Sequence, residues 1–143
     1  MQPAFAYPQT SHVPPILDLG DSVERARLST GAVTAFFNIM AIWKIRDEDA
    51  RALLGGLSNG TFYALKKGTG KPLDEDRLRR ISYLIGIFKA LNILHGQDLA
   101  DRWMQLPNSN RIFNGSTALA YLIRGGLPAF QTLRRLLDAR RGG

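Results

Sequence analysis

The sequence predicts an all-α protein in which a helix-turn-helix unit is followed by a smaller helical region. Apolar residues recur at spacings of three and four along most of the chain, as they do on the buried face of a helix. Alternating patterns typical of strands are scarce, and glycine or proline residues separate about seven helical segments. The 143 residues, of which 45% are hydrophobic, are enough for one core or for two small cores in contact.

Residues 1–20 are predicted to form a Pro-rich flexible arm. The first 17 residues hold four of the seven prolines, and proline disfavours a helix because it fixes φ and lacks a backbone N–H donor. Helical periodicity begins near Asp21. Its first apolar stripe comprises Phe36, Phe37, Met40, Ile42, Trp43 and Ile45.

Two short helices separated by a glycine-containing turn are predicted between Asp47 and Lys67. Acidic residues at 47–49 suit the positive end of the first helix, and the glycine pair at 55–56 suits its termination. Ser58 is the expected N-cap of the second helix, and Gly68 is expected to close it. The inward-facing positions of this unit are Ala50, Leu53, Leu54, Phe62 and Leu65.

A helix from Asp74 to about His95 is predicted to be the longest of the chain, and Gly96 ends it. Its apolar positions recur with helical spacing at Leu78, Ile81, Leu84, Ile85, Phe88, Leu91 and Leu94. Shorter helices are expected over 98–104 and 117–124, followed by a last helix that begins at Pro128. The chain end at 140–143, Arg-Arg-Gly-Gly, is expected to fray. We therefore divide the chain into the arm 1–20, a helix-turn-helix region 21–96 and a helical region 97–143.

The charge distribution favours a polyanionic partner and excludes several other classes. The net charge is +7, with +4 on residues 31–95, +4 on residues 96–143 and −1 on residues 1–30. Such a basic field attracts nucleic acid, although a merely soluble basic surface has the same composition. Cysteine is absent, so disulfides, thiolate catalysis and cysteine-based zinc sites are excluded. No segment has a membrane-spanning or secretory pattern, which predicts a cytoplasmic protein without a membrane partner.

No enzyme is predicted, because convergent reactive groups are missing. His12 lies in the arm and His95 at a helix end, while the acidic runs at 47–49 and 74–76 stand at expected helix starts. We expect no catalytic residue, no metal ligand and no small-molecule cofactor. The loop at 68–71, Gly-Thr-Gly-Lys, is not a phosphate-binding P-loop, because Leu65 occupies the required glycine position and Pro72 follows the lysine.

The second helix of the 47–67 unit carries the predicted DNA-binding residues, because in such a unit that helix enters the major groove. Small polar residues at its start can reach base edges or phosphates, and the lysines would neutralise phosphates. These residues are Ser58, Asn59, Thr61, Lys66, Lys67 and Lys71. The three arginines at 77, 79 and 80 are expected to extend the basic surface. The alternative is an ordinary helical hairpin with a solvated lysine pair.

The residue pattern from about Phe36 to Leu137 resembles the Xre/MbcA/ParS antitoxin family. The most specific parts are Trp103-x-x-Leu-Pro-Asn108 and Phe113-x-Gly115. The other matching positions are Trp43, Ala50, Leu53, Leu54, Gly55, Ser58, Leu91, Leu94, Gly96, Ala100, Leu119, Leu122, Ile123, Gly125 and Gly126. His95 is a departure, since phenylalanine is expected before this glycine.

The resemblance implies a homodimeric antitoxin that binds the operator of its own operon and represses it. It also implies a RES-domain toxin as partner, of a class that consumes NAD, with the antitoxin C-terminus near the entrance of the toxin's active site. The resemblance makes 97–143 the region for toxin binding and dimerisation, and the residues expected to bind the toxin are Arg140, Arg141, Gly142 and Gly143. A transcriptional regulator with an unrelated protein partner and a protein-only adaptor remain as alternatives.

Overall fold

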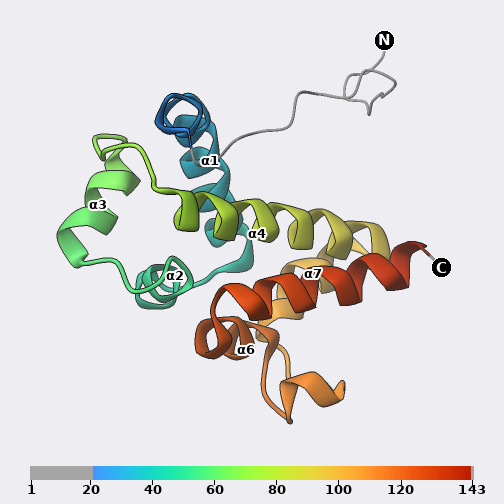
Figure 1. Cartoon of the computed structure of the whole chain (residues 1–143). Helices are drawn as coiled ribbons and strands as arrows, with labels where there is room; N and C mark the ends of the chain where they lie inside the picture. The colour runs from blue at the N-terminus through green and yellow to red at the C-terminus, as the bar shows by residue number, and fades with distance from the viewer. Residues whose placement is uncertain (1–20, 143) are drawn as a thin grey trace, which may run out of the picture.

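Seven α-helices and two short 3-10 helices account for most of residues 21–142, the part of the chain that the computed structural model describes (Figure 1). In chain order they are α1 (Ser22–Trp43), α2 (Asp47–Leu53), α3 (Asn59–Lys67), α4 (Glu75–Leu94), α5 (Gln97–Arg102), η1 (Trp103–Gln105), η2 (Arg111–Phe113), α6 (Ala118–Gly125) and α7 (Leu127–Gly142). Within these residues the only β-type pairing is one isolated antiparallel bridge between Pro107 and Thr117. The predicted all-α class is confirmed. The arm at 1–20 and Gly143 lie outside the described residues.

Side-chain caps set the starts of four helices, and they include the predicted cap Ser58. The side chains of Asp21, Ser58, Asp74 and Thr117 each accept a hydrogen bond from a backbone N–H in the first turn of the helix that follows. Such a cap contributes roughly 1 kcal/mol, because it satisfies a donor that has no partner within the helix. One expectation is wrong: α1 has 22 residues and is longer than α4, which has 20.

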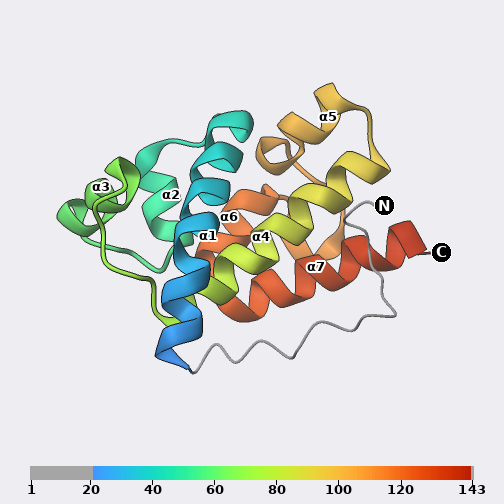
Figure 2. The same ribbon diagram turned by 90° about the horizontal axis from the view of Figure 1, so that it is seen from above.

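Helix α4 lies in the middle of the molecule (Figure 1, Figure 2). Helix α1 crosses it on one side, and α7 runs alongside it over most of its length. Helices α2 and α3 lie at the end of the molecule where α4 begins, and α5 follows the other end of α4. The buried apolar side chains form one continuous cluster that includes residues on both sides of position 96. The regions 21–96 and 97–143 therefore share a core, and the division between them remains a prediction about their roles.

A glycine on α4 leaves room for an arginine side chain of α7. Gly86 is buried on α4, and a Cβ at this position would overlap the guanidinium of Arg134 on α7. The Arg134 Nε atom in turn donates a hydrogen bond of 2.9 Å to Asp138 one turn later. Only a residue without a side chain leaves room for this guanidinium between the two helices.

Candidate functional site

Helices α2 and α3 form the helix-turn-helix unit, with boundaries close to those that the sequence predicts. Both glycines of the turn adopt positive φ, at 86° for Gly55 and 83° for Gly56, a region that residues with a side chain rarely adopt. Ser58 caps α3 by accepting a hydrogen bond of 3.2 Å from the backbone N–H of Thr61. Gly68 closes α3 in the left-handed conformation, with φ of 84°.

The predicted inward positions hold the two short helices against the core. Five apolar side chains are at most 4% exposed. They are Ala50, Leu53 and Leu54 of α2 and its C-cap, and Phe62 and Leu65 of α3. The Phe62 ring packs edge-on against Phe37 of α1, with 5.4 Å between the ring centroids. One face of α3 is therefore fixed by packing, and the opposite face projects from the end of the molecule (Figure 1).

The C-terminal end of α2 is held by arginines from α4. Arg77 Nε donates a hydrogen bond of 2.9 Å to the carbonyl of Leu54, and Arg80 Nη1 donates one of 3.1 Å to that of Leu53. These carbonyls are among those that a helix leaves without an internal partner. The Arg80 guanidinium also bonds Asp76 at 2.9 Å and lies 5.7 Å from the centroid of the Phe130 ring on α7.

These contacts correct the expectation that all three arginines extend the basic surface. The side chain of Arg77 is only 25% exposed and that of Arg80 only 15%, because both reach under the α2–α3 turn. Arg79 points outward with 47% exposure, but it pairs with Glu75 at 2.7 Å. The positive charges of these three arginines are therefore largely compensated by contacts within the molecule.

The exposed edge of α3 carries the predicted DNA-binding residues of this helix. Ser58, Asn59, Thr61, Lys66 and Lys67 are all exposed, as the helical pattern predicts. The Ser58 hydroxyl donates to the Thr61 hydroxyl at 3.0 Å, so these two side chains support each other at the start of the helix. Asn59 and Lys67 make no side-chain hydrogen bond or ion pair with other residues of the described part of the chain.

Lys66 differs from Lys67 because its charge is compensated by α2. Its Nζ lies 2.9 Å from Asp47 Oδ1, and the Tyr63 hydroxyl donates to Asp47 Oδ2 at 3.1 Å. The hydrogen bond from Lys66 is the main cause that lowers the pKa of the Asp47 carboxyl below its ordinary value; partial burial opposes it, and the bond from Tyr63 adds to it. The sequence did not predict this cluster, since Asp47 and Lys66 are 19 positions apart and no local signal joins them.

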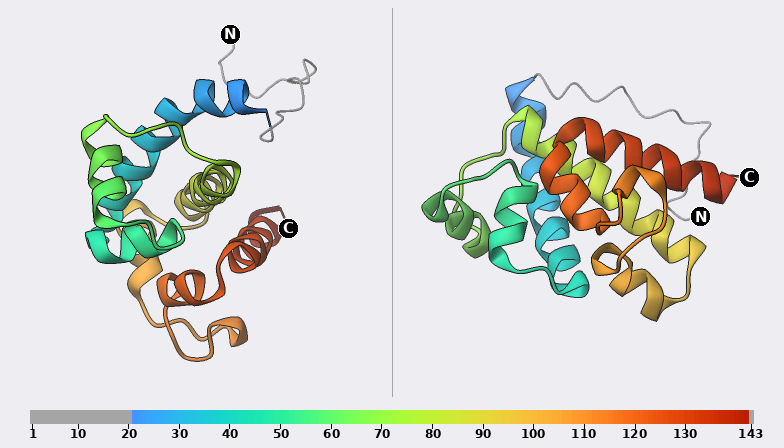
Figure 3. Two further views of the ribbon diagram at one scale, coloured as in Figure 1. Left: turned by 60° about the vertical axis from the view of Figure 1, so that its left-hand side comes forward. Right: turned by 90° about the horizontal axis from the view of Figure 1, so that it is seen from below.

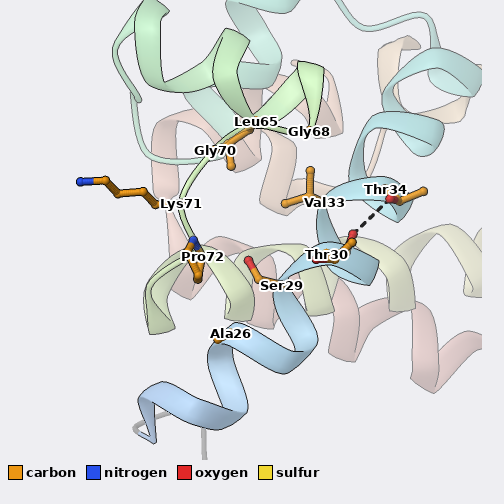
Figure 4. A pocket seen from close by; sticks show the side chains of 10 residues that line it. All are labelled: Ala26, Ser29, Thr30, Val33, Thr34, Leu65, Gly68, Gly70, Lys71 and Pro72. Atoms are coloured by element: carbon orange, nitrogen blue, oxygen red, sulfur yellow. Dashed lines mark hydrogen bonds between the residues drawn. The ribbon is translucent and has the colours of Figure 1, made fainter.

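The loop that carries Lys71 is anchored to α1 (Figure 4). The Ser29 hydroxyl, 5% exposed, accepts a hydrogen bond of 2.8 Å from the backbone N–H of Leu73. Figure 4 shows the Lys71 side chain extending away from the loop and from α1. On the α3 side of the loop, Thr61 and Lys71 line the same hollow of about 450 Å³. The structure therefore brings these two predicted DNA-binding residues together.

The residues predicted to bind a toxin lie in the last turn of α7. Arg140, Arg141 and Gly142 are exposed there and continue the helix, so the expectation of a frayed end is wrong for these three residues. Asp138 supports this turn, because it pairs with Arg134 at 2.9 Å and with Arg141 at 3.7 Å. Gly143 lies outside the described residues. The end of α7 and the exposed edge of α3 lie at opposite ends of the molecule in all views (Figure 1, Figure 2, Figure 3).

The described residues offer no arrangement typical of a metal site. Over residues 21–142, acidic and histidine side chains nowhere gather in a group of three or more that could hold a metal ion. None of the helices in the same range combines the length and the hydropathy that crossing a membrane requires.

Comparison with known proteins places the helix-turn-helix unit within a described domain. Residues 21–86 match the family described as the antitoxin Xre-like helix-turn-helix domain. This segment runs from the cap of α1 to just past the middle of α4 and includes α2 and α3. The protein y4oB of Sinorhizobium fredii (strain NBRC 101917 / NGR234), described as uncharacterized, is 35% identical over 130 residues, which cover 90% of this chain and 98% of that protein. No solved structure matches the chain.

Proposed function

Because the chain belongs to the family of the rhizobial protein y4oB and carries an antitoxin Xre-like helix-turn-helix domain, we propose that it is a type II antitoxin with two separate binding surfaces. The edge of α3 binds the operator of its own operon and represses transcription. The end of α7 binds a RES-type, NAD-consuming toxin near its active site. Both activities belong to a cytoplasmic homodimer.

The observation that carries the DNA-binding part is the exposed polar edge of α3 on a helix that is packed on its other face. Phe62 and Leu65 hold this helix, while Asn59 and Lys67 face solvent. A short helix that presents polar and cationic side chains in this way can enter a major groove and contact base edges and phosphates. Lys71, which extends from the neighbouring loop, adds a phosphate contact.

A salt titration tests this proposal. Binding to DNA from upstream of the gene should weaken with salt, and Lys67→Gln and Lys71→Gln should each reduce the slope of log K against log salt by about 0.9 for the lost phosphate contact. Lys89→Gln is the matched control, because Lys89 is exposed on the distant half of α4. Equal slopes for all four proteins would mean that the DNA surface lies elsewhere.

The toxin-binding part is supported by the separation of the two ends and by the charge of α7. Arg135, Arg140 and Arg141 are exposed on this helix, and Asp138 is its one acidic residue. Arginine is suited to bidentate pairing with carboxylates at the rim of a partner's cleft. A protein bound at this end leaves α3 accessible, so one molecule can engage toxin and operator together.

Removal of residues 139–143 tests this second surface. The truncated protein retains Leu133 and Leu137 in the core, so we expect a folded protein that still binds DNA but no longer neutralises a RES-type toxin. Full neutralisation by the truncated protein would exclude the end of α7 as the essential contact. Sedimentation of the full chain tests the homodimer.

The Asp47–Lys66 pair favours one alternative, a protein-only adaptor. This carboxylate places negative charge beside α3 and compensates one of its two lysines. Binding of the toxin without any salt-dependent binding to DNA would support the adaptor. Operator binding without neutralisation of a RES-type toxin would instead support a transcriptional regulator with an unrelated partner.

A further inference from the structure

An apolar groove lies between the N-terminal half of α1 and the first half of α4. It has a volume of about 350 Å³. Its lining contains no charged residue and only one hydroxyl, that of Ser82. The lining residues are Leu28, Gly31, Ala32, Leu78, Ile81, Ser82 and Ile85.

The groove is an uncovered part of the hydrophobic core. Leu78 and Ile81 form its floor at 4% and 1% exposure, whereas Leu28 and Ile85 on its walls are only half-buried. Gly31 on its rim has no atom within 4 Å of the position that a Cβ would take. The space beside Gly31 is therefore open, whereas at Gly86 the Arg134 side chain of α7 fills it. An uncharged lining of this kind suits an apolar chain segment and offers nothing to a polyanion.

We propose that the groove is the docking site of residues 13–17 of the same chain, Val-Pro-Pro-Ile-Leu. Residues 1–17 carry no Lys, Arg, Asp or Glu, and the apolar side chains of 13–17 match the lining. Two of these five residues are prolines, which bring no backbone N–H donor into an apolar site that has few acceptors.

The lengths of the segments fit this occupant. Leu17 precedes the cap residue Asp21 by four positions, which span up to about 14 Å in an extended chain. Leu28 follows that cap by seven positions, or about 10 Å along the axis of α1. A reversal at 18–20, Asp-Leu-Gly, uses residue types that favour turns and brings residues 13–17 back along α1. A second copy of the chain is a poorer fit, because a groove lined by seven residues is small beside the roughly 800 Å² per partner of a stable interface.

Engineered cysteines test this placement directly, since the natural chain has none. A disulfide requires Cα atoms about 4.4–6.8 Å apart, so Ile16→Cys with Ser82→Cys should close within one chain under mild oxidation. The control pair is Ile16→Cys with Thr30→Cys, because Thr30 is exposed on α1 but lines a different hollow, between α1 and the loop that carries Lys71. At least tenfold faster closure with Ser82→Cys supports the proposal. Equal rates, or disulfides mainly between chains, overturn it.

A stability cycle provides an independent measurement. Deletion of residues 2–17 and the substitution Ser82→Glu should each lower Tm by about 3–6 °C, the first by removing the occupant and the second by placing a charge in its site. The variant with both the deletion and Ser82→Glu should have the same Tm as the less stable of the two single variants, because the site is already empty. The loss of Tm caused by Thr30→Glu, in contrast, should add to that caused by the deletion. Additive losses for the deletion and Ser82→Glu would overturn the proposal. Neither test uses DNA or a toxin, so both outcomes are independent of the proposed function.

Discussion

Replacement of Arg80 by methionine should destabilise the protein strongly without weakening its attraction for DNA. Methionine keeps the apolar stem of the side chain but removes the guanidinium, which is 15% exposed and joins three elements. The lost contacts are the hydrogen bond to the Leu53 carbonyl at 3.1 Å, the ion pair with Asp76 at 2.9 Å and the cation–π contact with Phe130 at 5.7 Å.

The expected magnitude follows from these three contacts. Loss of a charged hydrogen bond that leaves the Leu53 carbonyl without this donor costs about 1.5–3 kcal/mol. The ion pair contributes about 0.5 kcal/mol, because Asp76 is substantially exposed, and the cation–π contact contributes about 0.5–1 kcal/mol. We therefore expect a loss of about 2.5–4.5 kcal/mol in the free energy of unfolding, which lowers Tm by roughly 7–17 °C.

Denaturant unfolding of matched variants measures this loss. Arg79→Met is the control, because Arg79 lies on the same helix with 47% exposure and has only the pair with Glu75, so its loss should be below about 0.5 kcal/mol. The salt dependence of DNA binding should be the same for Arg80→Met as for the unmodified protein. The interpretation that Arg80 holds α2 and α7 to α4 is wrong if Arg80→Met costs no more than Arg79→Met, or if Arg80→Met reduces the salt slope as loss of a phosphate contact would.

Three further predictions follow from contacts that single residues make. Ser29→Ala should lower the free energy of unfolding in urea by about 1–3 kcal/mol, because it leaves the buried backbone N–H of Leu73 without its acceptor. The control Thr34→Ala removes an exposed hydroxyl and should lower it by less than about 0.5 kcal/mol. Gly86→Ala should stabilise the protein less than Gly31→Ala, which should stabilise α1 by about 0.5–1 kcal/mol, because a Cβ at position 86 displaces the Arg134 guanidinium from its bond to Asp138; equal effects would contradict this use of Gly86. The pKa of Asp47 is lowered in the folded protein, so its contribution to stability is present above the unfolded-state pKa near 3.9 and is lost as pH falls through the lower folded value. Asp47→Asn should therefore destabilise at pH 7 but have little effect at pH 2, as measured by thermal unfolding at both values.

One core connects the two ends of the molecule. The exposed edge of α3 and the end of α7 lie at opposite ends, but both belong to helices that contact one core. Arg80 links α2 to the start of α7, because it bonds the Leu53 carbonyl and lies over the Phe130 ring. Displacement of the start of α7 would therefore disturb a contact that supports the helix-turn-helix unit.

Much of the helix-turn-helix unit could be predicted from the sequence. Ser58 as cap, Asn59–Lys67 as helix and Gly68 as its closing residue agree with the structure. So do the buried positions Phe62 and Leu65. These features depend on interactions within one or two turns of the chain, which residue type and spacing determine. The same local signals identified the all-α class.

Which charges face solvent was decided only by the tertiary structure. Lys66 and Lys67 are adjacent and chemically identical, yet only Lys66 meets Asp47, because α2 and α3 are packed at one particular angle. Arg77 and Arg80 carry the same charge as Arg79 but reach carbonyls more than 20 positions away. Such pairs depend on how the helices cross, and the crossing is set by the packing of the whole core rather than by any local pattern. The sequence by itself therefore determined the helices and their inward faces, and the packing of those helices decided which cations remain available to a partner.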